Sequence, residues 1–246
     1  MSSDVWGNDT AMEYDATSAA MFDPAVLVPT VDRLEQLARG GPVLEFAVGT
    51  GRVALALSAR GLSVSGIELS PHMADQLRIK PGADSIPVVI GDMRTTRVKG
   101  SFRLVYLVWN SIMNVTTQAG QVEVFENAAA HLDEGGYFVI EVGVHTPDRG
   151  TTLQRGQVFA MDDDHVGIDT FDDPVAQLLT SHHWFEVNGH LRHDSAQFRY
   201  VWPSELDLMA RIAGLRLVHR WGGWREEVFD SECTSQVVVY EKSPTR

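Results

Sequence analysis

The sequence predicts a doubly wound α/β fold with a small antiparallel insertion and a helical N-terminal segment. Three observations predict it. From Val43 to Val142, short apolar runs alternate with helical patterns, as in a parallel sheet covered by helices on both faces. After Val142, strand patterns follow one another through tight connections. The first forty residues carry one or two helical patterns before any strand, which predicts a lid rather than a core element.

Five apolar runs predict the strands of the parallel sheet. They are Val43–Phe46, Ser63–Glu68, Ile86–Ile90, Leu104–Trp109 and Tyr137–Val142. Each run is dense in Val, Ile or Leu and bounded by Gly, Pro, Asp or Asn, which is typical of buried strands. Helices are predicted between the runs over Arg52–Arg60, Pro71–Leu77 and Gln118–Leu132. The glycines of DEGG are predicted to stop the last of these helices.

The chain after the fifth run predicts an antiparallel insertion and then a closing hairpin. The insertion strands are QVFAM, VGIDTF, LLTSHHWFEV and HLRHDSAQFRYVW, with Asn188-Gly189 as a hairpin turn. A helix in PSELDLMARIAG is predicted to begin at Ser204 as N-cap, with Asp207 three residues later. LRLVHRW and SQVVVYEK are predicted to pair at the sheet edge. The expected divisions are a lid (1–40), a core (41–145), an insertion that caps a substrate (146–202) and the closing helix and hairpin (203–246).

The composition and net charge of the chain argue against several classes of binding partner. The 246 residues carry a net charge of −13, and neither Lys nor Arg forms a run that follows phosphates, so nucleic acid and anionic membranes are not expected partners. The single Cys233 excludes an intrachain disulfide and a thiolate metal cage. With no signal peptide or spanning apolar stretch in the sequence, a cytoplasmic protein is predicted, with a homodimer as an open option.

A glycine turn after the first strand raises the question of a cofactor. In VLEFAVGTGRVALAL, Gly49 and Gly51 allow the chain to turn sharply and bring a ligand to the backbone N–H groups of the next helix. GTGRVA fits the dinucleotide fingerprint of NAD enzymes. With one substitution, the loop also fits the E/D-x-G-x-G-x-G pattern of enzymes that use S-adenosylmethionine (SAM). A structural turn without a ligand is the third alternative.

Four further features bear on the choice between SAM and NAD, and three of them favour SAM. Glu45 ends the first strand, where a carboxylate repels pyrophosphate but accepts a hydrogen bond from the ammonium of SAM. Glu68 ends the second strand and suits ribose hydroxyls in either cofactor. Asp92 follows the third strand and suits the adenine amino group, with Met73 and Met93 as apolar walls. The terminal hairpin is not how a dinucleotide domain usually closes.

At this point the chain resembles the class I (Rossmann-like) SAM-dependent methyltransferase family, small-molecule branch. The segments LEFAVGTGR, GIELS, GDM, LDEGGYFVIEV and ELDLMARIAGLRLV stand in the family's order. The resemblance implies a seven-stranded, mainly parallel sheet, the cofactor SAM and the product S-adenosyl-L-homocysteine (SAH). By position it implies that Glu45, Ala47 and Gly49 line the methionine end, Glu68 and Leu69 the ribose, and Asp92 with Met93 the adenine. Ala47 departs from the family, which has glycine there.

The chemistry of methyl transfer points to further candidates. An in-line displacement needs an aligned acceptor, and an aromatic face suits the sulfonium, for which Tyr14 and Trp109 are candidates. Asn110 and Asn114, beyond the fourth strand, are candidates to orient the acceptor. Glu141 and His145, at and beyond the end of the fifth strand, are the candidate catalytic bases, with His145 more often an ordinary loop histidine.

The histidines of the insertion invite a metal-site interpretation, which the register argues against. With Asn188-Gly189 as the turn, alternation places His182 with His193 on one face and His183 with His190 on the other. Neither face then holds a third ligand, so no metal is predicted. The prediction is a SAM-dependent methyltransferase acting on an O or N nucleophile of a small molecule. The alternatives are an NAD(P)-dependent oxidoreductase and a SAM-binding protein without catalysis.

Overall fold

The computed structural model describes residues 6–144, 156–163, 165–187 and 189–243. Its elements, in which η denotes a 3₁₀ helix, follow in chain order. They are α1 (Asn8–Thr17), η2 (Ala19–Phe22), α2 (Pro24–Ala38), β1 (Val43–Phe46), α3 (Arg52–Ala59), β2 (Val64–Glu68), α4 (Pro71–Arg78), η3 (Ala83–Ser85), β3 (Val88–Ile90), β4 (Phe102–Leu107), η4 (Ser111–Asn114), α5 (Gln118–His131), β5 (Leu132–Gly143), β6 (Gly156–Met161), β7 (His165–Asp173), β8 (Leu178–Val187), β9 (His190–Arg199), α6 (Pro203–Ile212), β10 (Leu215–Trp221) and β11 (Ser235–Lys242).

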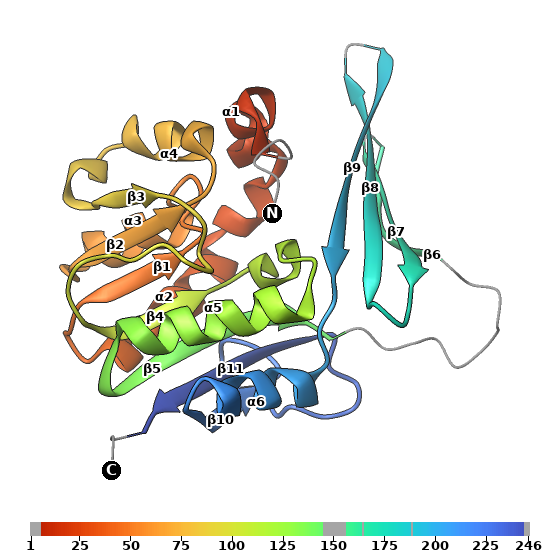
Figure 1. Cartoon of the computed structure of the whole chain (residues 1–246). Helices are drawn as coiled ribbons and strands as arrows, with labels where there is room; N and C mark the ends of the chain where they lie inside the picture. The colour runs from red at the N-terminus through yellow and green to blue at the C-terminus, as the bar shows by residue number, and fades with distance from the viewer. Residues whose placement is uncertain (1–5, 145–155, 164, 188, 244–246) are drawn as a thin grey trace.

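The main sheet has seven strands in the order β10-β11-β5-β4-β1-β2-β3 (Figure 1). Strands β1 to β5 pair in parallel, whereas β11 lies antiparallel between β5 and β10. The doubly wound sheet and its closing hairpin are thus confirmed. Since parallel strands end at one edge, the loops after β1, β2, β3 and β4 meet there, where ligands of such sheets bind.

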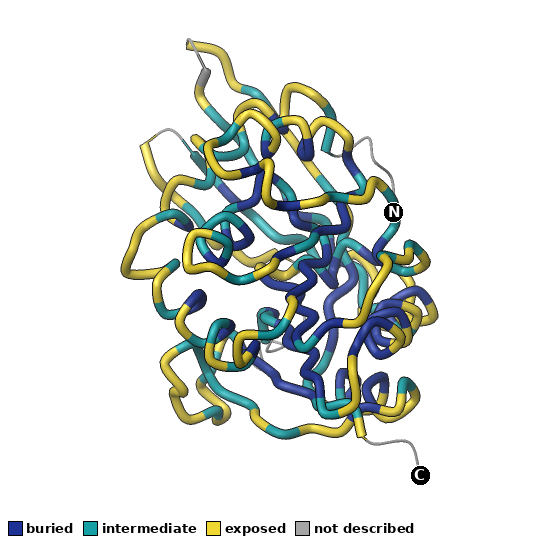
Figure 2. Tube along the Cα trace, turned by 90° about the vertical axis from the view of Figure 1, so that its left-hand side faces the viewer, coloured by how far each residue is buried: buried dark blue, intermediate teal, exposed yellow. Residues whose placement is uncertain are grey.

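Apolar side chains of the strands alternate between two core layers. Leu44 and Phe46 of β1 belong to the cluster that α5 and α6 cover, through residues such as Phe125. Val43 belongs to the opposite cluster, which contains Leu34 of α2, the buried residues of α3 and Leu77 of α4. Figure 2 shows the buried residues gathered along the centre of the molecule. Burial of this kind is the main contribution to folding, at about 25 cal/mol per Å² of apolar surface.

Three local expectations differ from the structure. α2 is part of the core rather than of a lid, because Val31, Leu34 and Ala38 are fully buried. α6 begins two residues earlier than predicted, with Trp202 as N-cap instead of Ser204, because the fixed φ of Pro203 suits the first helical position. The DEGG glycines do not cap α5. Its last residue is His131, and β5 begins at Leu132 in extended geometry.

The insertion forms a separate four-stranded antiparallel sheet in the order β6-β7-β8-β9. It stands beside α1 and α5 in Figure 1, and its edge strand β9 packs against η4 at the end of β4. The predicted register is confirmed, since Trp184 pairs with His193 and Val187 with His190. None of the helices in the described ranges is long and apolar enough to cross a membrane.

Candidate active site

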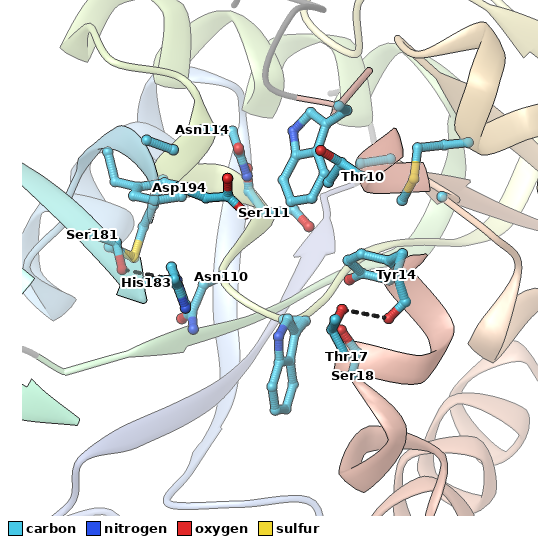
Figure 3. Close-up of a pocket in the computed structure, with 18 of the residues that line it drawn as sticks. Thr10, Tyr14, Thr17, Ser18, Asn110, Ser111, Asn114, Ser181, His183 and Asp194 are labelled. Carbon is cyan, nitrogen blue, oxygen red and sulfur yellow. Dashed lines mark hydrogen bonds between the residues drawn. The ribbon is translucent and has the colours of Figure 1, made fainter. Parts of the chain in front are cut away.

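A cavity of about 1060 Å³ lies between α1, the strand ends of the main sheet and the insertion sheet (Figure 3). One side is formed by the loops after β1, β2, β3 and β4, the second by one face of α1, and the third by side chains of β6 to β9. Ligand sites for one drug-sized molecule span roughly 300–1,000 Å³. The cavity therefore has room for a cofactor and a second ligand together.

The turn after β1 places three residues in left-handed backbone geometry. Ala47 has φ 54°, Gly49 has φ 55° and Gly51 has φ 84°. Ala47 and Gly49 line the cavity, as predicted for cofactor contacts, whereas Gly51 does not. A side chain at Gly51 would approach Leu77 Cδ1 to 2.2 Å, so this glycine allows α3 to pack closely against α4.

Glu68 is the buried carboxylate of the cavity wall. Its Oε2 accepts the Gly49 N–H at 2.8 Å and its Oε1 accepts the Ser70 N–H at 2.8 Å. It therefore ties the loop after β1 to the start of α4. Burial raises the pKa of Glu68, and the backbone donors oppose that shift. Leu69 and Met73 line the cavity next to it.

Glu45 lies behind the cavity wall rather than on it. Only 4% of its surface is exposed, and its Oε2 accepts a 2.6 Å hydrogen bond from the hydroxyl of Tyr106. Burial raises the pKa of Glu45 to about 8, against the lowering effect of that hydrogen bond. A contact between Glu45 and a ligand ammonium stays a prediction.

Asp92 also lies outside the lining, although its neighbours Gly91 and Met93 belong to it. The guanidinium of Arg94 donates to both carboxylate oxygens, at 2.7 to 3.1 Å. Burial raises the pKa of Asp92, but the hydrogen bonds from Arg94 outweigh burial and bring it below its usual value. An adenine amino group would therefore meet a carboxylate that already has a partner.

The turn after β4 carries Trp109 and Asn110, both of which line the cavity with positive φ values of 54° and 58°. Such geometry is strained for side chains larger than glycine. The neighbouring strand β5 holds it in place. Asn110 Oδ1 accepts the Gly143 N–H at 2.6 Å, and the Trp109 N–H donates to Glu141 Oε2 at 3.0 Å. Arg52 covers one face of the Trp109 ring, 5.6 Å from its centroid, so a ligand meets only the other face.

Glu141 is not placed as a catalytic base. Its second oxygen, Oε1, accepts a 2.7 Å hydrogen bond from the indole of Trp224, and the residue does not line the cavity. Both oxygens hold protein groups, so the expectation for Glu141 is wrong. His145, the other candidate base, lies outside the described residues. Asn114 lines the cavity on η4, where its amide donates to the Ser111 carbonyl at 3.3 Å.

One face of α1 lines the cavity, and of its residues the sequence predicted only Tyr14. Its members recur at helical spacing, and they are Asp9, Thr10, Glu13, Tyr14 and Thr17. That spacing in NDTAMEYDAT was the available signal. Two contacts join α1 to the core. The Thr50 hydroxyl donates to Asp15 at 2.6 Å, and Lys80 pairs with Asp15. Tyr14 packs edge-on against Trp6, and burial raises its pKa.

The insertion sheet supplies the third wall, through Ser181, His183 and Phe185 of β8 and residues of the strands beside it. Figure 3 shows His183 and Tyr14 on opposite sides of the cavity. His182 is stacked on His193, which shares its face in the predicted register. His183 lies on the opposite face, as predicted, and its hydrogen-bond partner there is His165 of β7. The described residues contain no cluster of three metal-ligating side chains.

Comparisons with known proteins identify the family. The family model described as "Methyltransferase domain" matches residues 43–136. The solved structure of the CcbJ methyltransferase from Streptomyces caelestis is similar with a TM-score of 0.79 and 31% identity, over 88% of this chain and 89% of that one. The chain belongs to the class I SAM-dependent methyltransferases. Its cofactor is therefore SAM, which supplies a methyl group activated on a sulfonium, and not NAD.

Two further relatives of this methyltransferase are similar to it, one in sequence and one in structure. The cypemycin N-terminal methyltransferase of Streptomyces sp is 26% identical over 240 residues, which are 96% of this chain and 97% of the relative. The SAM-bound CalS10, an amino pentose methyltransferase from Micromonospora echinaspora, is 20% identical with a TM-score of 0.65, over 88% of this chain and 90% of its own. The second likeness shows the fold alone.

Proposed function

We propose that the methyl acceptor of this enzyme is the amino group of a small molecule. The observation that carries the proposal is the charge of the cavity. Four carboxylates line it on the sides of α1 and the insertion sheet, namely Asp9, Glu13, Asp169 and Asp194. Among the described lining residues, Arg192 is the one Lys or Arg side chain, and it is paired with Glu13 and Asp194. Such a cavity attracts cations, and an amine is a cation before it reacts.

A relative that matches this chain over almost its whole length supports an amine acceptor. The cypemycin enzyme is named for methylation at an N-terminus. A hydroxyl acceptor of similar size is the alternative, and it gains nothing from the acidic lining.

The cofactor is proposed to lie across the strand ends of the main sheet. Glu68, with both oxygens fixed by backbone N–H groups, suits the two ribose hydroxyls, next to Leu69. Ala47 and Gly49 suit the amino-acid end. Met73 and Met93 offer apolar sides for the adenine ring.

The methyl group is then proposed to point toward Tyr14, Trp109 and Asn110. Asn110 and Asn114 would orient the acceptor between η4 and β9. The insertion sheet would exclude water from the reacting atoms.

The test pairs calorimetry with matched acceptors. SAM, SAH and NAD are titrated into the purified enzyme, and micromolar binding of SAM and SAH without NAD is expected. Methylation is then followed by mass spectrometry with pairs that share a skeleton: glucosamine and glucose, 2-phenylethylamine and 2-phenylethanol, and a dipeptide with free or acetylated N-terminus. Products from the amines alone support the proposal. Methylation of the hydroxyl members at equal or higher rates overturns it.

A further inference from the structure

Two histidines of the insertion sheet form a hydrogen-bonded pair on the cavity wall. His183 Nδ1 and His165 Nε2 are 3.0 Å apart, and both side chains line the cavity. The rings are nearly parallel, with 3° between their planes and 5.2 Å between their centroids. The second nitrogen of His183, Nε2, has Ser181 Oγ at 3.4 Å, which is too long for a strong hydrogen bond. The pair therefore has one nitrogen with only a weak protein partner.

The sequence around this pair builds an apolar niche for His183. Gly167 lies opposite His183 on β7, and a side chain there would collide with the ring of Phe159, at 2.3 Å. Glycine thus lets Phe159 reach His183, at 5.2 Å between ring centroids. Phe185 stacks on His165 on the other side, at 4.6 Å. Burial, and after it the proximity of His165, lower the pKa of His183, which favours the neutral ring at pH 7.

From this geometry we infer that His183 is a catalytic residue, the base that takes the proton from the acceptor amine, and that His165 passes this proton on. The inference rests on the proposed function. If His183 Nδ1–H donates to His165 Nε2, then His183 Nε2 carries the lone pair that the amine proton needs. After this proton arrives, the Nδ1 proton moves to His165, which is half-buried. The pair thus carries a proton away from the reacting amine.

The step balances in atoms and electrons. The ammonium N–H bond breaks, its proton bonds to His183 Nε2, and the electron pair stays on the amine nitrogen. That pair forms the new N–C bond to the methyl group, while the C–S bond breaks and its electrons stay on sulfur. One proton has moved from the amine to the histidine pair and then to water. An unassisted alkylamine such as 2-phenylethylamine, with an ordinary pKa of about 10, is almost fully protonated at pH 7 and has no free pair.

The titratable groups around His183 act on this role in opposite directions. His165 and Asp169 come from β7, His182 is adjacent on β8, and Asp194 pairs with His183 across from β9. The carboxylate of Asp194 favours the imidazolium that forms during the reaction, whereas the two histidines disfavour it. Asp194 therefore offsets part of the cost of forming the imidazolium, and the lowered pKa favours its prompt loss of the proton through His165.

A first test needs no acceptor. In the SAH complex of the full chain, ¹⁵N NMR of histidine side chains reports the protonation and tautomer of each ring, with the His183→Asn spectrum as assignment. We expect His183 to be neutral at pH 7 with the proton on Nδ1. An imidazolium or an Nε2–H tautomer would overturn the inference, whatever the acceptor of the enzyme is.

A second test measures turnover of an amine acceptor, chosen from the acceptor pairs because the wild-type enzyme methylates it. His183→Asn should lower kcat/KM at pH 7 by at least ~100-fold, with SAH affinity unchanged. The loss should shrink about tenfold per pH unit toward the pKa of the amine, because solvent then deprotonates it. His165→Asn should show a smaller loss. The matched control is His182→Asn, on the same strand but facing His193 and Thr170, which should stay within about threefold of wild type.

The outcomes separate the inference from the function beneath it. Amine methylation by wild type with an equally active His183→Asn at pH 7 overturns the role of His183 alone. A loss in His183→Asn that does not recover with pH indicates a structural role and also overturns it. Methylation of hydroxyl acceptors only, in the wild type, overturns the proposed function instead.

Discussion

At the scale of single residues, the structure changes the role of Glu141 from base to support. One oxygen accepts the backbone N–H of Trp109 and the other accepts the indole N–H of Trp224. Trp109 and Asn110 are held in left-handed geometry, which costs of order 1–3 kcal/mol for such residues. Glu141 therefore compensates strain in the turn that presents Trp109 and Asn110 to the cavity.

We expect Glu141→Gln to weaken SAH binding by roughly tenfold, because the amide has one acceptor oxygen for two donors. The pH dependence of turnover should keep its shape, since the carboxylate takes no proton. Calorimetry and a pH profile of kcat/KM measure the two quantities, with Glu126→Gln on the exposed face of α5 as control. A loss of the acidic limb of the profile with unchanged SAH affinity would contradict the supporting role.

Features that depend on local sequence patterns were predicted correctly, whereas features that depend on side-chain packing were missed. The left-handed turn at Gly49 and the pairing of Trp184 with His193 follow from local patterns, and both were predictable. The Arg94 guanidinium on Asp92 and the loss of Glu141 as a base depend on side-chain packing that no spacing encodes.

At the scale of elements, the sheet order follows from alternation and crossovers, but the enclosure of the cavity does not. α1 and β9 meet across it through an ion pair between Glu13 and Arg192, whose nearest nitrogen and oxygen are 2.6 Å apart. These residues are 179 positions apart in sequence, and the pairing of two exposed charges at that distance has no sequence signature. The same contact joins the N-terminal helix to the insertion sheet at the cavity to which the proposed function assigns the ligands.

We expect Arg192→Gln to raise the dissociation rate of SAH by about two- to fivefold, because an exposed ion pair contributes up to ~1 kcal/mol. The wild-type rate should approach that of the variant at high salt, which screens the pair. Stopped-flow dissociation at low and high salt measures both effects. Arg78→Gln removes an exposed ion pair with Asp75 on α4, outside the cavity, and serves as control. An equal change in Arg78→Gln, or a wild-type rate that is independent of salt, would count against the contact.

At the scale of the whole molecule, the buried carboxyl of Glu45 couples folding to pH. Its pKa is raised by burial from an ordinary value near 4.5 to about 8 in the folded protein. The folded state therefore binds the proton more tightly than the unfolded chain does. Its contribution to stability is complete below the unfolded pKa and is lost as pH rises through the folded one. Between about pH 5 and 8, the free energy of unfolding should fall by up to ~1.4 kcal/mol per pH unit.

Glu45→Gln should remove this slope and be more stable than wild type near pH 8, because the amide stays neutral and still accepts the Tyr106 hydroxyl. Urea unfolding across that pH range measures the effect, and a wild-type stability that does not fall with pH would contradict it. Saturation with SAH adds a second readout. If the ligand ammonium lies beside Glu45, it favours the carboxylate, lowers its pKa and flattens the wild-type slope. An unchanged slope with SAH bound would place the ammonium elsewhere in the cavity.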